Sequence, residues 1–355
     1  MSELLIYGAN GYTGELCARE AATRGLAPIL AGRNRAAVEG LAGELGLAAR
    51  VFDLDQPEAT ARSLTGVAAV LHCAGPFVRT SGPMVAACLA AGAHYLDITG
   101  EIEVFEKVFA RHAQAERAGV ALLPGVGFDV VPSDCLAGRL AGALPEATSL
   151  VLAFGTAGGS WSRGTLKTMI ESLPHAGAIR RDGRLVPVPL AWEAREIEFS
   201  GRFGKRWCAS IPWGDLSTAF RSTGIPDIQV FTAMSRREVR RARWLRPFLP
   251  ILGWGPIKRR LQRRVERRLT GPSAEVRTTA RTYLWGEAAN AAGRKVRATL
   301  ETPEAYGFTA TSAIACTERV LGGEVKPGAW TPAQAFGARF VDGLPGVVAG
   351  PIVEV

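Results

Sequence analysis

Six short apolar runs alternate with helical patterns between Leu4 and Leu123, and this alternation restricts the fold more than any other feature of the chain. The segments between the runs carry apolar residues at helical spacing, and two of them, 36–45 and 102–118, are each followed by a glycine that would end a helix. Continuous apolar strands separated by amphipathic helices are typical of a parallel sheet covered on both faces. The sequence therefore predicts an α/β, Rossmann-type doubly wound domain with its ligand crevice at the carboxyl ends of the strands. The expected strands are Leu4–Tyr7, Pro28–Ala31, Ala49–Asp53, Ala68–His72, Tyr95–Ile98 and Val120–Leu123.

A glycine-rich loop follows the first apolar run and leads directly into a helical pattern that ends near Gly25. Glycines permit a tight turn and a close approach of the backbone to a pyrophosphate, and a helix N-terminus offers free N–H groups. A glycine triplet alone could be an ordinary strand–helix turn, but here further strand–helix units follow it. The loop therefore predicts a dinucleotide site, and its expected contact residues are Gly8, Asn10, Gly11, Tyr12, Thr13 and Gly14.

The second run ends in a basic sequence, Ala31-Gly-Arg33-Asn34-Arg, where an NAD site usually has a carboxylate. A guanidinium can hold the adenosine phosphate of NADP with two hydrogen bonds, whereas Asp or Glu would repel it. Arg33 and Asn34 therefore predict NADP(H) rather than NAD(H). The alternative is a pair of solvated arginines in an Arg-rich chain.

Later strand ends supply the other candidates for the cofactor site. Asp53 and Leu54 follow the third run, where such folds meet the adenine ring, and residues 72–77 follow the fourth, where the backbone passes the nicotinamide ribose. Asp97 ends the fifth run and is expected only to orient a neighbouring group. Any one of these residues could also serve only to form a turn in a loop. The cofactor contacts expected here are Asp53, Leu54, Ala74, Gly75, Pro76 and Thr99.

Polar residues at the strand ends are the candidates for proton transfer. Reduction by a nicotinamide needs an electron-poor carbon held against the cofactor and a source of a proton. Asp129 stands just past the last expected strand and is the first candidate, followed by Glu101 and Tyr12. A helix cap or a turn residue explains Asp129 equally well. Arg163 and Lys167 could face a substrate anion, although a charged outer helix face explains that pair too.

Five motifs occur in one order within the first 140 residues: GANGYTG, AGRN, HCAGPF, YLDITGE at 95–101 and GFDVVPSD at 127–134. As a set, this series resembles the saccharopine dehydrogenase-like oxidoreductases and is similar to their bacterial branch that includes trans-acting enoyl reductases. Looser similarities follow at 162–169 and 331–337. The family name does not settle the substrate, because many members need not act on saccharopine.

The resemblance implies an NADP(H)-binding domain, a second domain that shapes a substrate pocket, and hydride transfer between cofactor and substrate. On this basis we expect an NADPH-dependent oxidoreductase acting on a hydrophobic acyl substrate, an enoyl thioester linked to coenzyme A or to a carrier protein. Two alternatives stay open. One is a saccharopine-type amino-acid dehydrogenase that acts through an imine, and the other is a non-catalytic NADP-binding protein associated with a membrane or a partner.

The pattern changes after Thr148 and predicts a second, α+β domain with a mixed or antiparallel sheet. The expected limits are an NADP-binding domain at 1–130, a substrate or oligomerisation domain at 131–330, and a C-terminal helix and tail at 331–355 that pack back on the first domain. The alternating stretch 274–288 could be an internal strand or the edge of a homodimer. The other expected elements are hairpin strands at 194–200 and 206–211, a strand at 294–302, and helices at 303–320 and 331–344.

Residues 236–268 form a basic insertion in that second domain, with 13 basic and two acidic side chains around an apolar, proline-broken centre. Such a segment can bind an anionic membrane surface, or dock an acyl carrier protein or the phosphates of coenzyme A. It could also be only a solvated lid. No nucleic-acid-binding module surrounds it, so nucleic acid is not an expected partner.

Composition excludes several other classes of protein. With 47% apolar and 21% charged residues, the chain is not disordered throughout. The six cysteines and four histidines show neither a C-x-x-C pair nor ligand spacing, so no metal site is expected. The N-terminus lacks the pattern of a signal peptide, and we expect a cytoplasmic protein, with the inner face of the membrane as an alternative site of association.

Overall fold

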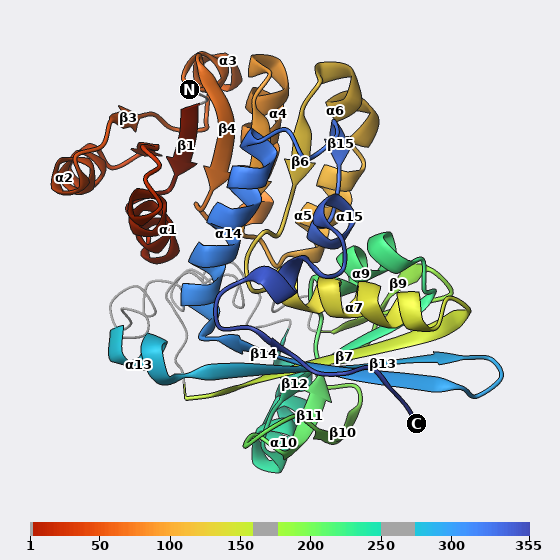
Figure 1. Ribbon diagram of the computed structural model, residues 1–355. Coiled ribbons are helices and arrows are strands. Elements are labelled where there is room, and N and C mark those ends of the chain that lie inside the picture. The colour runs from red at the N-terminus through yellow and green to blue at the C-terminus, as the bar shows by residue number, and fades with distance from the viewer. Residues whose placement is uncertain (1–2, 159–176, 250–273) are drawn as a thin grey trace. The chain divides into compact units, whose positions relative to one another are not determined.

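The computed structural model describes residues 3–158, 177–249 and 274–355 (Figure 1). The chain forms two compact units. The first comprises Met1–Val131 with Tyr306–Phe336, and the second comprises Pro132–Ala305 with Gly337–Val355. The expected domain limits differ from these units, because the late segment 306–336 supplies a strand and helices to the first unit.

A parallel sheet of seven strands is the centre of the first unit. Its strands are β1 (Glu3–Tyr7), β2 (Ile29–Gly32), β3 (Ala49–Val51), β4 (Val67–His72), β5 (His94–Asp97), β6 (Ala121–Leu123) and β15 (Gly328–Ala329). They lie in the order β15-β6-β5-β4-β1-β2-β3, and every neighbouring pair is parallel. The six expected strands are thus confirmed as a Rossmann-type sheet. The strand order reverses between β1 and β4, which is where such a fold places its ligand.

Helices connect these strands. Within the described residues they are α1 (Tyr12–Thr23), α2 (Arg35–Leu45), α3 (Pro57–Arg62), α4 (Phe77–Ala91), α5 (Ile102–Phe109), α6 (His112–Ala118), α14 (Ala305–Leu321) and α15 (Pro332–Phe336). The expectation of one helix over 102–118 is wrong, because the chain breaks between α5 and α6. The break lets Nδ1 of His112 accept a 3.0 Å hydrogen bond from the backbone N–H of Ala329 on β15, a partner far away in the sequence.

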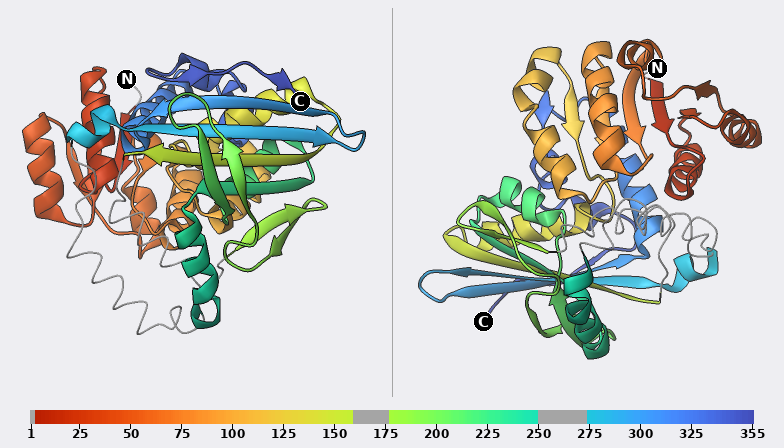
Figure 2. Two further views of the ribbon diagram at one scale, coloured as in Figure 1. Left: turned by 90° about the horizontal axis from the view of Figure 1, so that it is seen from below. Right: turned by 180° about the vertical axis from the view of Figure 1, so that it is seen from behind.

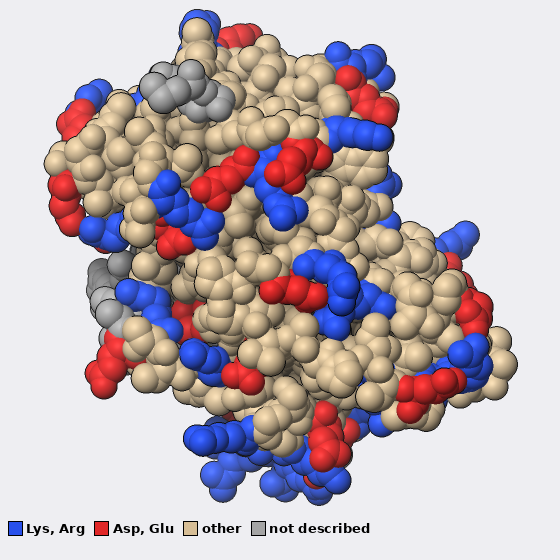
Figure 3. All heavy atoms as spheres, in the orientation of Figure 1, with Lys and Arg blue, Asp and Glu red and all other residues tan. Residues whose placement is uncertain are grey.

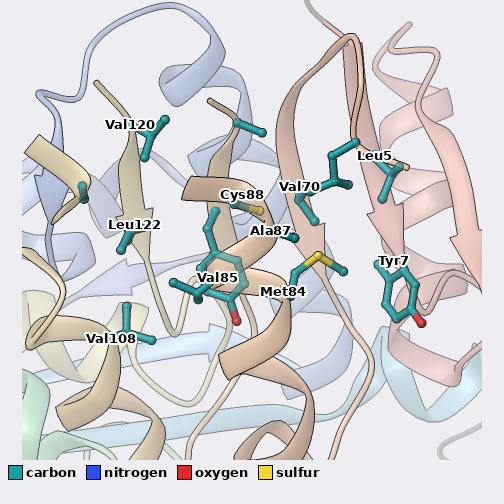
Figure 4. Close-up of a cluster of buried hydrophobic side chains, with 14 of the residues drawn as sticks. Leu5, Tyr7, Val70, Met84, Val85, Ala87, Cys88, Val108, Val120 and Leu122 are labelled. Atoms are coloured by element: carbon teal, nitrogen blue, oxygen red, sulfur yellow. The ribbon is translucent and has the colours of Figure 1, made fainter. Parts of the chain in front are cut away.

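Apolar side chains from the strands and from α4 form the core on one face of this sheet (Figure 4). Leu5, Tyr7 and Val70 come from the strands, and Met84 and Val85 come from α4; all five are buried. Helix α14 covers the opposite face of the sheet (Figures 1 and 2). The strands are therefore buried on both faces, as their continuous apolar runs predict.

The second unit is built on a mixed sheet of ten strands. Its strands are β7 (Ala147–Ala157), β8 (Ala178–Arg181), β9 (Arg184–Pro187), β10 (Ala194–Glu198), β11 (Lys205–Ser210), β12 (Asp227–Ala233), β13 (Arg281–Asn290), β14 (Lys295–Pro303), β16 (Val348–Ala349) and β17 (Val353–Glu354). The main order is β10-β11-β12-β7-β13-β14-β16, in which β12 is parallel to β7 and the other pairs are antiparallel. This arrangement confirms a second α+β unit with a mixed sheet.

Helices and a cluster of aromatic side chains complete the second unit. Its helices within the described ranges are α7 (Val131–Ala143), α9 (Asp215–Thr223), α10 (Arg236–Leu245) and α13 (Ala274–Thr279), with 3-10 turns η2 (Arg246–Phe248) and η3 (Phe340–Gly343). Helix α7 packs closely on the sheet, because a Cβ on Gly286 of β13 would stand 2.6 Å from Cδ1 of Leu140. In the aromatic cluster, the ring of Phe203 stacks on Tyr283 with centroids 4.9 Å apart.

Both expected hairpins are present, as β10–β11 and β13–β14. The long strand expected over 274–288 is wrong for residues 274–279, which form the helix α13. The hydroxyls of Thr278 and Thr279 there donate to the carbonyl of Glu275, which satisfies a helical acceptor. Strand β13 lies between β7 and β14, so it is an internal strand and offers no edge to a second copy.

The helix expected over 331–344 is also shorter than its pattern indicates. Thr331 caps its start by accepting a 3.2 Å hydrogen bond from the N–H of Gln334. Helix α15 ends at Phe336 because Gly337 adopts φ +87°, a conformation that stops a helix. The chain resumes only as the short turn η3.

Two expected features lie outside the described residues: the pair Arg163 and Lys167, and the part of the basic insertion from 250 to 268. The remaining part of that insertion, 236–249, is described and contains α10 and η2. Across the described ranges, no helix has both the length and the apolar character needed to span a bilayer.

Candidate functional site

Three loops of the first unit meet at the point where its strand order reverses. The backbone N–H of Gly8, after β1, donates a 2.8 Å hydrogen bond to the carbonyl of Ala31 on β2. A Cβ on Gly8 would stand 2.8 Å from Cβ of Ala74, which follows β4, and a Cβ on Gly32 would stand 2.9 Å from Oδ1 of Asn10. The loops after β1, β2 and β4 are therefore in direct contact, and the structure brings together the expected residues Gly8, Asn10 and Ala74.

The loop between β1 and α1 can turn this tightly only because glycines stand at positions 8 and 14. Gly8 adopts φ +82°, which favours glycine, and a Cβ on Gly14 would overlap the carbonyl oxygen of Gly8. Gly11 precedes α1 and has no side chain that could cap this helix. A helix N-terminus of this kind is a suitable binding site for an anion such as a pyrophosphate.

Gly14→Ala should weaken NADPH binding at least tenfold and lower stability by roughly 1–3 kcal/mol, because the added methyl group forces the backbone of Gly8 aside. A fluorescence titration with NADPH and a thermal melt would measure both effects. Gly43→Ala is the matched control, because a Cβ there meets nothing within 4 Å and lies inside α2. Equal behaviour of the two variants would contradict the steric role of Gly14.

Arg33, the residue expected to hold the adenosine phosphate, is exposed and lies directly after β2. Its charge acts on Tyr7, whose hydroxyl donates a 3.1 Å hydrogen bond to the carbonyl of Phe52. Burial raises the pKa of Tyr7 to about 12, and Arg33 partly opposes this rise while Asp53 adds to it. Arg33 and Asp53 thus lie near the same phenol, at the ends of β2 and β3. The side chain of Asn34 accepts a 3.2 Å hydrogen bond from the N–H of Ala37 and caps α2, so its contact with a cofactor stays a prediction.

The loop after β4 is held by its own hydrogen bonds. The hydroxyl of Thr80 donates to the carbonyl of Ala74 at 2.6 Å and lies 2.9 Å from Nε2 of His72. Burial lowers the pKa of His72 to about 3, so its ring is neutral. The peptide bond between Gly75 and Pro76 is cis, and α4 starts at the next residue. The expected cofactor contacts Ala74, Gly75 and Pro76 therefore form one ordered turn ahead of α4.

Glu101 fixes the start of α4. The backbone N–H groups of Phe77 and Val78 donate to its two carboxylate oxygens, at 3.0 and 2.8 Å. A carboxylate at a helix N-terminus also interacts favourably with the helix dipole. The N–H of Glu101 in turn donates a 3.1 Å hydrogen bond to the hydroxyl of Thr99, and both side chains are buried. Glu101 thus holds the turn that contains Pro76, and a direct role for Glu101 or Thr99 in catalysis or cofactor binding stays a prediction.

Asp129 lies next to Glu101. A Cβ on Gly100 would stand 2.7 Å from Oδ2 of Asp129, so the carboxyl group packs directly against the backbone beside Glu101. Burial raises the pKa of Asp129 to about 7, and the negative charge of Glu101 adds to this rise. Asp129 can therefore hold a proton near neutral pH, which is what a general acid requires.

A second buried carboxyl, that of Asp97, ties these loops together. It accepts hydrogen bonds from the N–H groups of Thr99 (3.0 Å) and Gly125 (2.8 Å) and from the hydroxyl of Tyr95 (2.6 Å). Burial raises its pKa to about 6, although these hydrogen bonds oppose the rise. Asp97 joins the end of β5 to the loop after β6 and so orients Thr99, as its position in the sequence predicts.

Residues from α14 support the same region, and sequence reasoning did not identify them. The hydroxyl of Thr309 accepts a 3.0 Å hydrogen bond from the N–H of Phe128, and the hydroxyl of Ser312 donates a 2.8 Å bond to the carbonyl of Val126. The ring of Tyr12 meets Tyr306 edge-on, with centroids 5.2 Å apart. The sequence feature that could have identified Thr309 and Ser312 is the presence of hydroxyl residues within an otherwise apolar helical pattern. The proposed chemical role of Tyr12 stays a prediction.

The described residues hold no group of three or more His, Cys, Asp or Glu side chains that could bind a metal ion. The expected contacts Thr13 and Leu54 lie in the loop–helix junction of α1 and after β3, and both are partly buried. These positions suit a dinucleotide that extends across the carboxyl ends of the strands.

Comparison with known proteins agrees with this geometry. Residues 4–123 match the family model described as the saccharopine dehydrogenase NADP binding domain. A Mycobacterium tuberculosis protein named as a trans-acting enoyl reductase is 34% identical over 190 residues, which are 49% of this chain and 45% of that protein. An Arabidopsis thaliana protein named as a saccharopine dehydrogenase-like oxidoreductase is 34% identical over 152 residues, which are 37% of this chain and 33% of that protein.

The match thus spans less than half of each of these relatives. A saccharopine dehydrogenase (L-Glu forming) from Saccharomyces cerevisiae has the same fold over 100% of both chains, with a TM-score of 0.64 and 13% sequence identity. The cofactor loops, the strand order and the matched residues all lie in the first unit. Residues 4–123 of this chain are therefore similar to the saccharopine dehydrogenase NADP binding domain.

Proposed function

We propose that this chain is an NADPH-dependent oxidoreductase that transfers hydride to a hydrophobic acyl substrate, with an enoyl thioester as the preferred class. The observation that carries the proposal is the half-buried carboxyl of Asp129, with a pKa of about 7, beside the loops of a domain that matches an NADP-binding family model. The likeness to proteins named as trans-acting enoyl reductases supports the choice of an enoyl substrate.

The residues that would hold the cofactor form a continuous set. The loop from Gly8 to Gly14 and the N-terminus of α1 suit the pyrophosphate, and Arg33 suits the adenosine phosphate. The turn at Ala74–Pro76 suits the nicotinamide ribose. NADPH, when bound, supplies the hydride.

The protein's own contribution to the chemistry is a proton. Hydride addition to the β-carbon of an enoyl thioester leaves negative charge on the α-carbon and the thioester oxygen, and this enolate must be protonated. Asp129 holds a proton near neutral pH and can give it to the α-carbon. Glu101 serves this step in two ways, because it positions the start of α4 and because its charge keeps Asp129 protonated.

Glu101→Gln should move the upper limb of the pH–rate profile to lower pH. The substitution removes the negative charge that helps to raise the pKa of Asp129, so Asp129 loses its proton at a lower pH. Glu103→Gln makes the same change of charge at an exposed position on α5 and should leave the profile in place. Identical profiles for the parent and Glu101→Gln would contradict the electrostatic link between the two carboxyls.

The test of the proposed function is NADPH consumption, followed by absorbance, with a panel of enoyl thioesters, imines and saccharopine. The enoyl group is offered as coenzyme A, pantetheine and acyl-carrier-protein thioesters, because the linkage to coenzyme A or a carrier is itself part of the proposal. Turnover of enoyl thioesters alone supports it. Turnover of saccharopine or of an imine would replace it with an amino-acid dehydrogenase, and NADPH binding without any turnover would favour a non-catalytic role.

A further inference from the structure

Helix α10 is the most basic of the described elements of the second unit. It starts with a capping box, in which Ser235 and Glu238 each bond the other's backbone N–H group. Glu238 is the one acidic residue between Ser235 and Leu249, whereas this stretch has six arginines. Figure 3 shows Lys and Arg side chains gathered at the lower end of the molecule, where Figure 1 places α10.

One side of α10 anchors it to its own unit. Val239 is buried against the sheet, and the guanidinium of Arg236 lies over the ring of Trp207, 4.5 Å from its centroid. Arg243 and Arg246 donate hydrogen bonds to backbone carbonyls of residues 190–192. These contacts fix the rotation of the helix about its axis and so decide which side chains face outward.

The outward side carries Arg237, Arg240, Arg241 and Trp244, all of them exposed. Their spacing of i, i+3, i+4 and i+7 places them on one face of an α-helix. No acidic side chain of the described residues lies within ion-pair distance of these three arginines. Like charges at this spacing repel and destabilise the helix, so the face is expected to gain stability when an anionic surface covers it.

Exposed aromatic side chains stand beside these arginines. Trp244 is 71% exposed and Phe248 is 43% exposed, and their ring centroids are 5.4 Å apart. Trp192, 45% exposed, lies in the segment whose carbonyls hold Arg243 and Arg246. These are all the exposed large aromatic residues of the described ranges. Aromatic rings with neighbouring arginines suit the boundary between lipid headgroups and acyl chains.

We infer that the outward face of α10, formed by Arg237, Arg240, Arg241, Trp244 and Phe248, binds the anionic headgroup layer of a phospholipid membrane. The arginines pair with lipid phosphates, and the two rings enter the upper acyl region. Both rings are exposed, and helix α10 stands out from its sheet (Figure 2), whereas the docking of a partner helix would need a groove. This surface would bring the protein to a membrane whatever reaction it catalyses.

The experiment is co-sedimentation of the full chain with vesicles of phosphatidylcholine alone and of phosphatidylcholine mixed with phosphatidylglycerol. We expect binding to the mixed vesicles only, and weaker binding as salt is added. The variant Arg237→Glu, Arg240→Glu, Arg241→Glu should bind about 100-fold or more weakly, since each arginine near an anionic surface contributes severalfold. Trp244→Ala should bind about tenfold more weakly, because it loses an apolar ring that becomes buried when the helix binds the membrane.

The matched control reverses three other exposed arginines of the second unit, Arg181→Glu, Arg184→Glu and Arg202→Glu, which change the net charge equally. The inference is supported if the control variant still binds vesicles and the α10 variant does not, provided that NADPH titration finds every variant folded. Failure of the parent to bind mixed vesicles at low salt would overturn it, as would equal losses in both triple variants. Binding of an acidic carrier protein through α10, without binding to vesicles, would overturn it in favour of a protein partner.

Discussion

Replacing Asp129 with Asn should lower kcat for the reduction by about 10²- to 10⁴-fold, the usual contribution of a general acid, while the affinity for NADPH stays unchanged. Asn has nearly the shape of the carboxyl group but no acidic proton to give to the enolate. The residues proposed to hold the cofactor do not include Asp129, so binding should survive. Steady-state kinetics would measure the rate, and a fluorescence titration would measure the affinity.

The pH dependence of the parent reports on the same group. Asp129 acts as an acid only while it is protonated, and burial together with the charge of Glu101 raises its pKa to about 7. We therefore expect kcat to be highest below this pH and to decline as the pH rises through it. The Asp129→Asn variant should retain only a low rate that lacks this decline.

Asp55→Asn is the control for both measurements, because it makes the same chemical change at an exposed position of the first unit. Its kcat and pH profile should match those of the parent. A normal rate in Asp129→Asn would remove Asp129 as the proton donor. Equal losses in both variants would mean that net charge, and not a positioned proton, controls the rate.

Arg33→Asp should weaken NADPH binding on the order of 100-fold, because it removes charge-assisted hydrogen bonds to the adenosine phosphate and adds a repelling carboxylate. Binding of NADH should change little, since NADH lacks this phosphate. The preference for NADPH over NADH would then fall by nearly the same factor. Titration of the two cofactors under identical salt conditions measures this preference directly.

Arg35→Asp is the matched control, two residues further along the chain. Its guanidinium is exposed and pairs with Glu39 on α2 at 2.7 Å, so its loss should affect α2 more than the cofactor. Equal losses of NADPH and NADH affinity in Arg33→Asp would contradict a phosphate contact. If Arg35→Asp lost as much of the preference for NADPH as Arg33→Asp, Arg33 would not be the specific phosphate contact.

Local sequence patterns determined much of the first unit. The six apolar runs became strands of one parallel sheet, because a strand buried on both faces needs apolar side chains at every position. The glycine loop was predictable for a steric reason, since a Cβ on Gly8 or Gly14 would meet backbone atoms. The role of Arg33 stays a prediction, which rests on the position after the second strand lying near the adenosine ribose in such a fold.

Tertiary structure alone decided the rest. Strand β15, and the support that Thr309 and Ser312 give to the loop after β6, come from a segment nearly 200 residues later. No local period in the sequence reports such a pairing. The break between α5 and α6 also depends on a distant contact, that of His112 with Ala329, which overrides a local helical pattern.

The clearest case is the pair of carboxyls at the proposed site. The sequence marks Asp129 and Glu101 as polar residues at strand ends, with no indication of which one keeps a proton. In the folded chain, two backbone N–H groups of α4 bind the Glu101 carboxylate, while Asp129 is half-buried beside that negative charge. The sequence alone determines the type and the chain position of these two residues. It does not determine which of them keeps a proton, because desolvation and the charge of a neighbour arise only once the chain has folded.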